Sequence, residues 1–239
     1  MILHVSKTSA EVIQSLAEFF IRTAQQAIQD NGRFTVSLSG GSSPKSLYEL
    51  LAAKYNNAID WKKVYFFFGD ERYVPADDER YNGLMVDKAL FNPLQIPTQN
   101  IFKIDTSLDT SASAKDYEDK IRGLFGDDKP AFDLMLLGLG DNSHTASLFP
   151  HTTILHEKTA LVKDVWVEEV GMYRISMTAP LINLSKNIVF FLFGKSKAPA
   201  VYNIIQREQN IEEYPAQLIH PVAGTLHWFM DTEAASDLK

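Results

Sequence analysis

Residues 132–150 read FDLMLLGLGDNSHTASLFP. The stretch opens with an apolar run, passes through Gly138 and Gly140, and then carries one histidine, His144, among small polar residues. An apolar run that ends in glycine predicts a buried strand followed by a tight loop. His144 is therefore expected just past the end of a strand, where open α/β sheets bind their ligands.

Two other apolar runs end in the same way. FTVSL at residues 34–38 leads into SGGSSP, and VYFFF at residues 64–68 leads into GDER. Helical patterns separate the runs, and several runs are apolar throughout, which indicates an α/β protein with a mainly parallel sheet covered on both faces. If the three strands are neighbours, their three loops meet in one crevice.

The remaining elements are expected from apolar spacing and from start and stop signals. Ser9 with Glu11 is expected to begin the first helix, and Asn31-Gly32 to end it. The expected helices span residues 9–30, 43–55, 82–90, 112–124 and 195–205. The expected strands span residues 34–38, 64–68, 132–140, 160–166, 173–177, 188–193 and 225–230.

The composition narrows the classes of function. A chain of 239 residues with 45% hydrophobic and 22% charged residues fits one large globular domain or two small ones. A net charge of −7 argues against nucleic acid and anionic membranes as partners, while a few local cations can still hold a small anion. The absence of cysteine excludes thiolate nucleophiles and disulfides and is compatible with the cytoplasm. We expect neither a signal peptide nor a membrane span.

The SGGSSP segment predicts an anion-binding loop. Gly40 and Gly41 let the backbone approach a ligand closely, and the N–H groups of a helix start favour negative charge. Ser42 and Ser43 add hydroxyl donors. The alternative is a tight turn with Ser43 as a helix N-cap. The segment lacks the Gly-Lys-Ser/Thr ending of a Walker loop and the G-x-S-x-G of a nucleophile elbow.

Charged residues follow two further strands. Asp70, Glu71 and Arg72 come directly after an apolar run, where they could hold a polar substrate or orient a base, or else form a local ion pair in a surface turn. Lys195 and Lys197 lie between a strand and a helix, where a cation could meet a phosphate. The alternative is that one or both lysines are simply solvated.

His144 has the chemistry of a general base. Its unperturbed pKa near 6.5 suits proton transfer near neutrality. The alternative is a hydrogen-bonded structural histidine. GLGDNSH departs from the dinucleotide fingerprint G-x-G-x-x-G at Ser143, which argues against a dinucleotide. The other histidines show no metal-ligand spacing, so a metal site has no support.

Together, SLSGGSSP, FFFGDERYVP, residues 132–150, and YRISMTAPLIN with FFLFGKSKA resemble the 6-phosphogluconolactonase family, which is related in fold to glucosamine-6-phosphate deaminase. The resemblance spans nearly the whole chain. It implies a single domain over residues 1–239, folded as a Rossmann-like α/β/α sandwich with a smaller appended β-containing region. It also implies a cytoplasmic enzyme without metal or organic cofactor that hydrolyses 6-phospho-D-glucono-1,5-lactone.

The resemblance also implies roles for individual residues. His144 would activate water, with Asp70 and Arg72 beside it as catalytic residues. Substrate and phosphate binding would fall to the remaining residues of the motifs: Gly40, Gly41, Ser42, Ser43, Asn142, Arg174 and Lys197.

One departure affects the expected chemistry. Where the family usually reads P-D-G-H-T, this chain reads Asp141-Asn142-Ser143-His144-Thr145, so that Asn142 takes the place of an acid. An amide cannot take a proton as a carboxylate can. Lactone hydrolysis moves no carbon-bound proton, so the change argues more against a deaminase than against a lactonase.

Three alternatives remain from the sequence. The chain could be a glucosamine-6-phosphate deaminase or isomerase, or a sugar-phosphate sensor without catalysis. It could also be an esterase of a non-phosphorylated lactone, which would leave the cations without a role. We expect the sugar-phosphate lactone to be its small-molecule partner, and the chain to be a monomer or a small homo-oligomer.

Overall fold

The computed structural model describes residues 1–239 and contains nine strands and seven α-helices. The strands are β1 (Ile2–Ser6), β2 (Phe34–Leu38), β3 (Val64–Phe68), β4 (Asp70–Arg72), β5 (Leu134–Leu137), β6 (Val162–Val167), β7 (Met172–Met177), β8 (Asn187–Leu192) and β9 (Thr225–Asp231). The α-helices are α1 (Ser9–Asn31), α2 (Ser42–Lys54), α3 (Asn82–Val86), α4 (Asn92–Leu94), α5 (Thr110–Phe125), α6 (Ala179–Ile182) and α7 (Ala198–Ile205).

Seven short turns of other helix types connect these elements. The 3₁₀ turns are η1 (Trp61–Lys63), η3 (Thr98–Asn100), η4 (Thr153–His156), η5 (Glu168–Val170), η6 (Lys195–Lys197) and η7 (Pro215–Leu218). A π-helical turn, η2 (Asp87–Phe91), joins α3 to α4 without a break in the chain's helical course.

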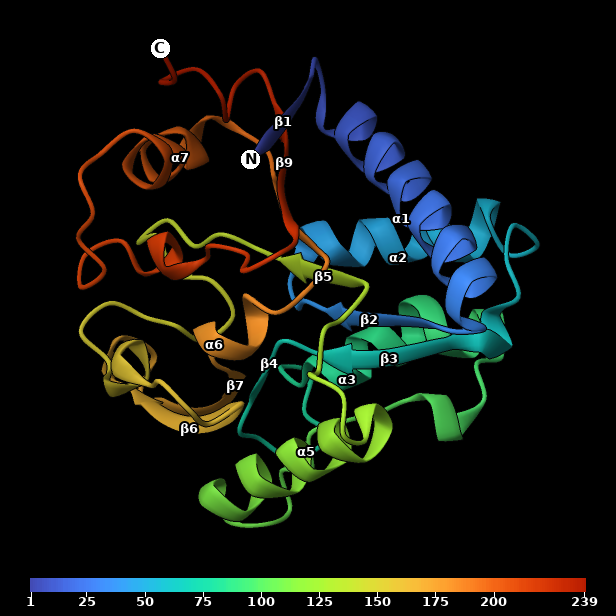
Figure 1. Ribbon diagram of the computed structural model, residues 1–239. Coiled ribbons are helices and arrows are strands. Elements are labelled where there is room, and N and C mark those ends of the chain that lie inside the picture. Colours follow the sequence, from blue (N-terminus) through green and yellow to red (C-terminus); the bar gives the residue numbers. More distant parts are fainter.

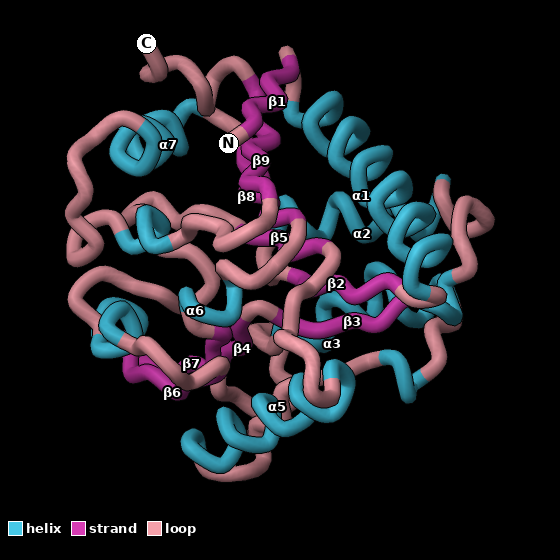
Figure 2. Tube along the Cα trace, in the orientation of Figure 1, coloured by secondary structure: helices cyan, strands magenta, loops and turns pink.

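Two sheets organise the molecule. The larger has six strands in the order β1-β9-β8-β5-β2-β3, and every neighbouring pair in it is parallel. Figure 2 shows these strands as one twisted band that runs from β1 to β3. The smaller sheet is antiparallel, in the order β4-β7-β6. The predicted α/β architecture with a mainly parallel sheet and a smaller β-containing region is confirmed.

Helices cover both faces of the large sheet, which explains why its inner strands are largely buried. All residues of β2 and β5 are buried. The helices α1 and α2 lie on one side of β2 and β3, and α5 lies on the other (Figure 1). The Tyr117 hydroxyl of α5 donates to the Phe68 carbonyl and accepts from its N–H, so that the helix is tied to the end of β3. No helix of the chain is both long and apolar enough to cross a bilayer.

The order of the strands brings the three predicted loops to one edge of the sheet. Strand β2 lies between β3 and β5, and all three are parallel. Their carboxyl ends therefore share one edge of the sheet, where parallel α/β sheets form their ligand crevice. The segments that follow Leu38, Phe68 and Leu137 all emerge at this edge.

The predicted boundaries are confirmed at some ends and wrong at others. Helix α1 begins at Ser9, as predicted, and its N-cap is Thr8: the Thr8 hydroxyl accepts from the Glu11 N–H, and the Glu11 carboxylate accepts from the Thr8 N–H. This is a capping box, in which each residue satisfies a free amide of the other. The helical region predicted to end at residue 90 continues to Leu94. Strand β1 was not predicted.

Two further corrections concern the site. Ser43 is not a helix N-cap, because α2 begins at Ser42 and its N-cap is Gly41, with φ 109° and no side-chain cap. Residues 70–72 form strand β4 and not a loop, because β7 supplies a partner for their backbone groups. A three-residue strand has too few positions for its alternation to be recognised in the sequence.

Candidate active site

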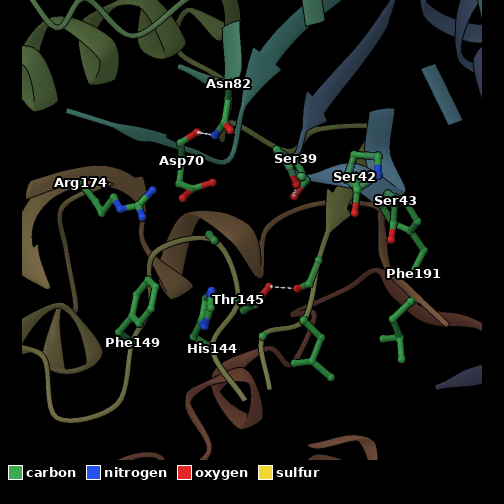
Figure 3. A pocket seen from close by; sticks show the side chains of 18 of the residues that line it. Ser39, Ser42, Ser43, Asp70, Asn82, His144, Thr145, Phe149, Arg174 and Phe191 are labelled. Atoms are coloured by element: carbon green, nitrogen blue, oxygen red, sulfur yellow. Dashed lines mark hydrogen bonds between the residues drawn. The ribbon is translucent and has the colours of Figure 1, made fainter. Parts of the chain in front are cut away.

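A cavity of about 270 Å³ lies at the carboxyl edge of the large sheet. Nine of the ten predicted site residues line it: Gly40, Gly41, Ser42, Ser43, Asp70, Arg72, His144, Arg174 and Lys197. Figure 3 shows the cavity with His144 facing Asp70, with Ser42 and Ser43 on one side and Arg174 and Phe149 on the other. The tenth, Asn142, does not line the cavity but contacts His144 Nδ1 through its side-chain oxygen.

His144 is held by contacts on one nitrogen and one ring face. Its Nδ1 lies 2.5 Å from the Asn142 side-chain oxygen, and its ring stacks on Phe149 with centroids 3.8 Å apart. Its Nε2 makes no hydrogen bond within the protein and is available to a ligand. Burial lowers the pKa of His144 to about 4, although the Asp70 and Glu169 carboxylates favour the charged ring. At neutral pH the imidazole is therefore uncharged.

The loop that carries His144 is fixed by backbone hydrogen bonds. The Gly140 N–H donates to the His144 carbonyl, and the Ser143 N–H donates to the Gly140 carbonyl. The Ser143 carbonyl accepts from the Ala216 N–H of η7, and the Thr145 hydroxyl donates to Gly138. These bonds form a compact turn at the end of β5, so the position of the imidazole is determined by the sheet.

The side chains of strand β4 alternate between two faces, so the charged residues of GDER point in different directions. Side chains of successive strand residues point to opposite faces. Asp70 and Arg72 line the cavity, whereas the Glu71 carboxylate turns into the protein and accepts from the N–H groups of Asn82 and Gly83 at the start of α3. Glu71 thus has a structural role as the cap of α3.

Asp70 is anchored on both sides. Its carboxylate accepts from the Ser147 hydroxyl at 2.6 Å, and its carbonyl accepts from the Asn82 amide at 3.0 Å. The Ser147 N–H donates to Ser176 on β7. A carboxylate in this network is held near the imidazole and stabilises positive charge there.

Three cations line the cavity. Arg72 and Arg174 are direct partners in the β4–β7 register, and the Arg72 guanidinium donates to the Arg80 carbonyl. Like charges directly opposite each other are unfavourable in a sheet. The Arg174 Nε is buried without a hydrogen-bond partner, and burial lowers its pKa. The pair therefore provides a strong attraction for an anion in the cavity.

Lys197 completes the positive lining. Its ammonium group donates to the Leu139 carbonyl and to the Asp141 carboxylate, both at 2.8 Å. Lys195, on the same 3₁₀ turn, is exposed and does not line the cavity. Asp141 is thus paired with Lys197 and does not take the place of Asn142 beside His144.

Sequence reasoning missed several lining residues: Ser39, Asn82, Thr145, Ala146 and Phe149. Phe149 lies in the segment 132–150, but only the turn at 145–148 brings its ring back onto His144. The close approach of Gly40 to Asn82 was also missed, since a Cβ on Gly40 would lie 1.9 Å from the Asn82 side-chain oxygen. No group of three or more histidine or acidic side chains is arranged to hold a metal ion.

The chain is similar to known proteins both in sequence and in structure. Residues 7–228 match the family described as glucosamine-6-phosphate isomerases/6-phosphogluconolactonase. A 6-phosphogluconolactonase of Synechocystis sp. is 40% identical over 90% of this chain and 88% of its own length. One from Nostoc sp. is 37% identical over 97% and 95%. The solved structure of a 6-phosphogluconolactonase from Trypanosoma cruzi superimposes with a TM-score of 0.91 at 27% identity, covering 100% of this chain and 97% of that one. The chain belongs to the glucosamine-6-phosphate isomerase/6-phosphogluconolactonase family.

Proposed function

We propose that this chain hydrolyses 6-phospho-D-glucono-1,5-lactone to 6-phosphogluconate, with His144 as the general base. The observation that carries the proposal is the state of the His144 ring. Its Nδ1 is engaged by an amide oxygen, its ring is uncharged at neutral pH, and its Nε2 is free in a cavity lined by cations. A neutral imidazole with a free nitrogen can accept a proton from water.

The reaction needs no covalent nucleophile, because a lactone carbonyl is already electrophilic. Water attacks C1 as its proton passes to Nε2 of His144. The carbonyl oxygen becomes an oxyanion in the tetrahedral intermediate. When the C1–O5 bond breaks, the proton on His144 passes to the departing ring oxygen, and the intermediate collapses to the carboxylic acid, which ionises.

Charges around the cavity favour each stage. Asp70, held by Ser147, stabilises His144 while the ring carries the proton. The Arg72 guanidinium stabilises the developing oxyanion, since donors fixed in advance cost no reorganisation during the reaction. Asn142 does not contact substrate; it accepts from Nδ1 and holds the ring.

We place the phosphate of the substrate at the start of α2. This helix has 13 residues, and no side chain caps its first amides, so that the N–H groups of Ser42 and Ser43 are available to an anion. Arg174 and Lys197 supply the positive charge. Holding the phosphate fixes the lactone against His144, and such orientation is a major source of rate enhancement. We place the enzyme in the cytoplasm, as a monomer or a small homo-oligomer.

The test is hydrolysis of freshly prepared lactone, coupled to 6-phosphogluconate dehydrogenase and corrected for spontaneous opening. His144→Ala should reduce kcat at least about 100-fold, the usual scale of a lost general base. His220→Ala is the control, because His220 is exposed and its side chain makes no hydrogen bond. Wild-type turnover in His144→Ala would remove the proposed base. Release of ammonia from glucosamine 6-phosphate, without lactone hydrolysis, would replace the lactonase by a deaminase.

A further inference from the structure

The side chain of Asn142 connects His144 to a carboxylate from a distant part of the chain. The Asn142 amide nitrogen donates to the Glu169 carboxylate at 2.6 Å, and its amide oxygen lies 2.5 Å from His144 Nδ1. Glu169 belongs to η5, the turn between β6 and β7. The same hairpin carries Arg174, so one element brings both residues to the site.

These contacts determine where the hydrogens are. An ionised carboxylate only accepts hydrogen bonds, so Glu169 must face the NH₂ group of Asn142. The amide oxygen then faces His144, where it also accepts from the His144 backbone N–H at 3.2 Å. An oxygen cannot donate, and so Nδ1 of the neutral ring must carry the hydrogen. The lone pair is left on Nε2, which faces the cavity.

We propose that Glu169 is a positioning residue for the lactonase reaction: it orients the Asn142 amide, and through it selects the His144 tautomer that can accept a proton from water. The inference rests on the proposed role of His144 as base. A carboxylate in direct contact with a catalytic histidine would do the same in one step. Here a neutral amide makes the contact and Glu169 supplies the negative charge behind it.

The two hydrogen bonds that link Glu169, Asn142 and His144 also act during the reaction. When His144 takes the proton from water, its Nδ1–H bond to the amide oxygen gains charge and becomes stronger. Hydrogen bonds in series polarise one another, so the Glu169 charge reaches the ring through the amide. The other charged groups that act on His144 are Asp70, Arg174 and Lys197.

The test exchanges the amide of Asn142 and the carboxylate of Glu169. Asn142→Asp places two carboxylates at hydrogen-bond distance, where they repel each other, and kcat at pH 8 should fall about tenfold or more, the scale of one lost charge-assisted hydrogen bond. In the double variant Asn142→Asp/Glu169→Gln, the glutamine NH₂ donates to the new aspartate, and the aspartate accepts from Nδ1–H. Its kcat should return to within about threefold of wild type. Glu169→Ala should lower kcat several-fold.

A pH profile separates positioning from a merely structural role. The double variant puts a carboxylate directly against His144, which raises the pKa of the ring. The acid limb of kcat/KM should therefore move to higher pH by about one unit. Glu168→Ala is the matched control. Glu168 lies on the same turn, and its carboxylate accepts only from the Trp166 indole N–H, so the kcat and the acid limb of this variant should stay at the wild-type values.

The inference is overturned if Glu169→Ala keeps the wild-type kcat, or if Asn142→Asp loses no more activity than the double variant. With His144→Ala inactive in the same assays, either result leaves the lactonase proposal standing and removes Glu169 from it. An active His144→Ala variant would instead remove the base and this inference together.

Discussion

The ring of His144 occupies the space that a side chain on Gly140 would need. A Cβ at position 140 would lie 2.1 Å from His144 Nδ1 and 2.2 Å from its Cε1, far inside van der Waals contact. Gly140 also receives the hydrogen bond that closes the turn, since its carbonyl accepts from the Ser143 N–H. The glycine thus allows the backbone to pass directly beneath the proposed base.

Gly140→Ala should therefore produce a folded protein with a displaced base. The imidazole must give way, because it is a side chain and the backbone on the other side is fixed by β5. We expect kcat to fall about tenfold or more, with a smaller change in KM, since misplacement by about 1 Å can cost about 100-fold. Thermal unfolding and steady-state kinetics measure both effects.

Gly123→Ala is the control for this change. Gly123 lies within α5, and a Cβ there would meet nothing within 4 Å. Alanine is favoured over glycine inside a helix by about 1 kcal/mol. This variant should keep wild-type kinetics and unfold at a slightly higher temperature. Wild-type kcat in Gly140→Ala would contradict the positioning of His144 by the turn.

The lowered pKa of His144 predicts the pH range in which the proposed base is active. Burial lowers the pKa of the ring to about 4, and only the neutral ring can accept a proton. The base form therefore persists well below the ordinary histidine pKa near 6.5 and is lost as the pH falls through about 4. In an NMR titration of the free enzyme, the imidazole signal absent from His144→Ala should titrate near pH 4.

The same titration of His144 should appear in the kinetics as the acid limb of kcat/KM. The limb that belongs to His144 should lie near pH 4. The phosphate of the substrate titrates near pH 6 and adds its own step, which is read from the substrate's titration alone. An NMR midpoint near 6.5 for His144 would contradict a ring shielded from water by Phe149 and its loop.

The two lysines of the 3₁₀ turn η6 should differ in function. Lys197 lines the cavity and is held by Leu139 and Asp141, whereas Lys195 is exposed. Lys197→Met keeps most of the side-chain volume and removes the charge. It should raise KM for the lactone about tenfold or more, because a charged hydrogen bond to phosphate contributes about 1.5 kcal/mol or more.

Lys195→Met provides the matched comparison, with the same change of charge two residues away. Its KM should stay within about twofold of wild type, because exposed charges are screened by solvent. The constant to compare is KM at fixed ionic strength. An equal rise of KM in both variants would show that the lysines act through the overall field and not through a phosphate contact.

Local pattern was sufficient for most of the fold. The apolar runs at 64–68 and 188–193 identified buried strands, because a parallel sheet covered on both faces leaves no polar alternation along such strands. Strand β1 was not predicted. It is an edge strand whose Ile2, Leu3 and Val5 side chains stay exposed. Its partner β9 lies at the other end of the chain. Such a long-range pairing leaves no local signal.

Local sequence is enough to give the residue types of the site and their places just after strands: the glycine-serine loop, the GDER charges and His144. How these residues work together depends on contacts between distant segments. The order β5-β2-β3 brings three loops to one edge, and the β4–β7 register sets Arg72 opposite Arg174. The β6–β7 hairpin places Glu169 against Asn142. Strand order, register and hairpin contacts depend on packing between distant segments, whereas strand and loop propensities are local.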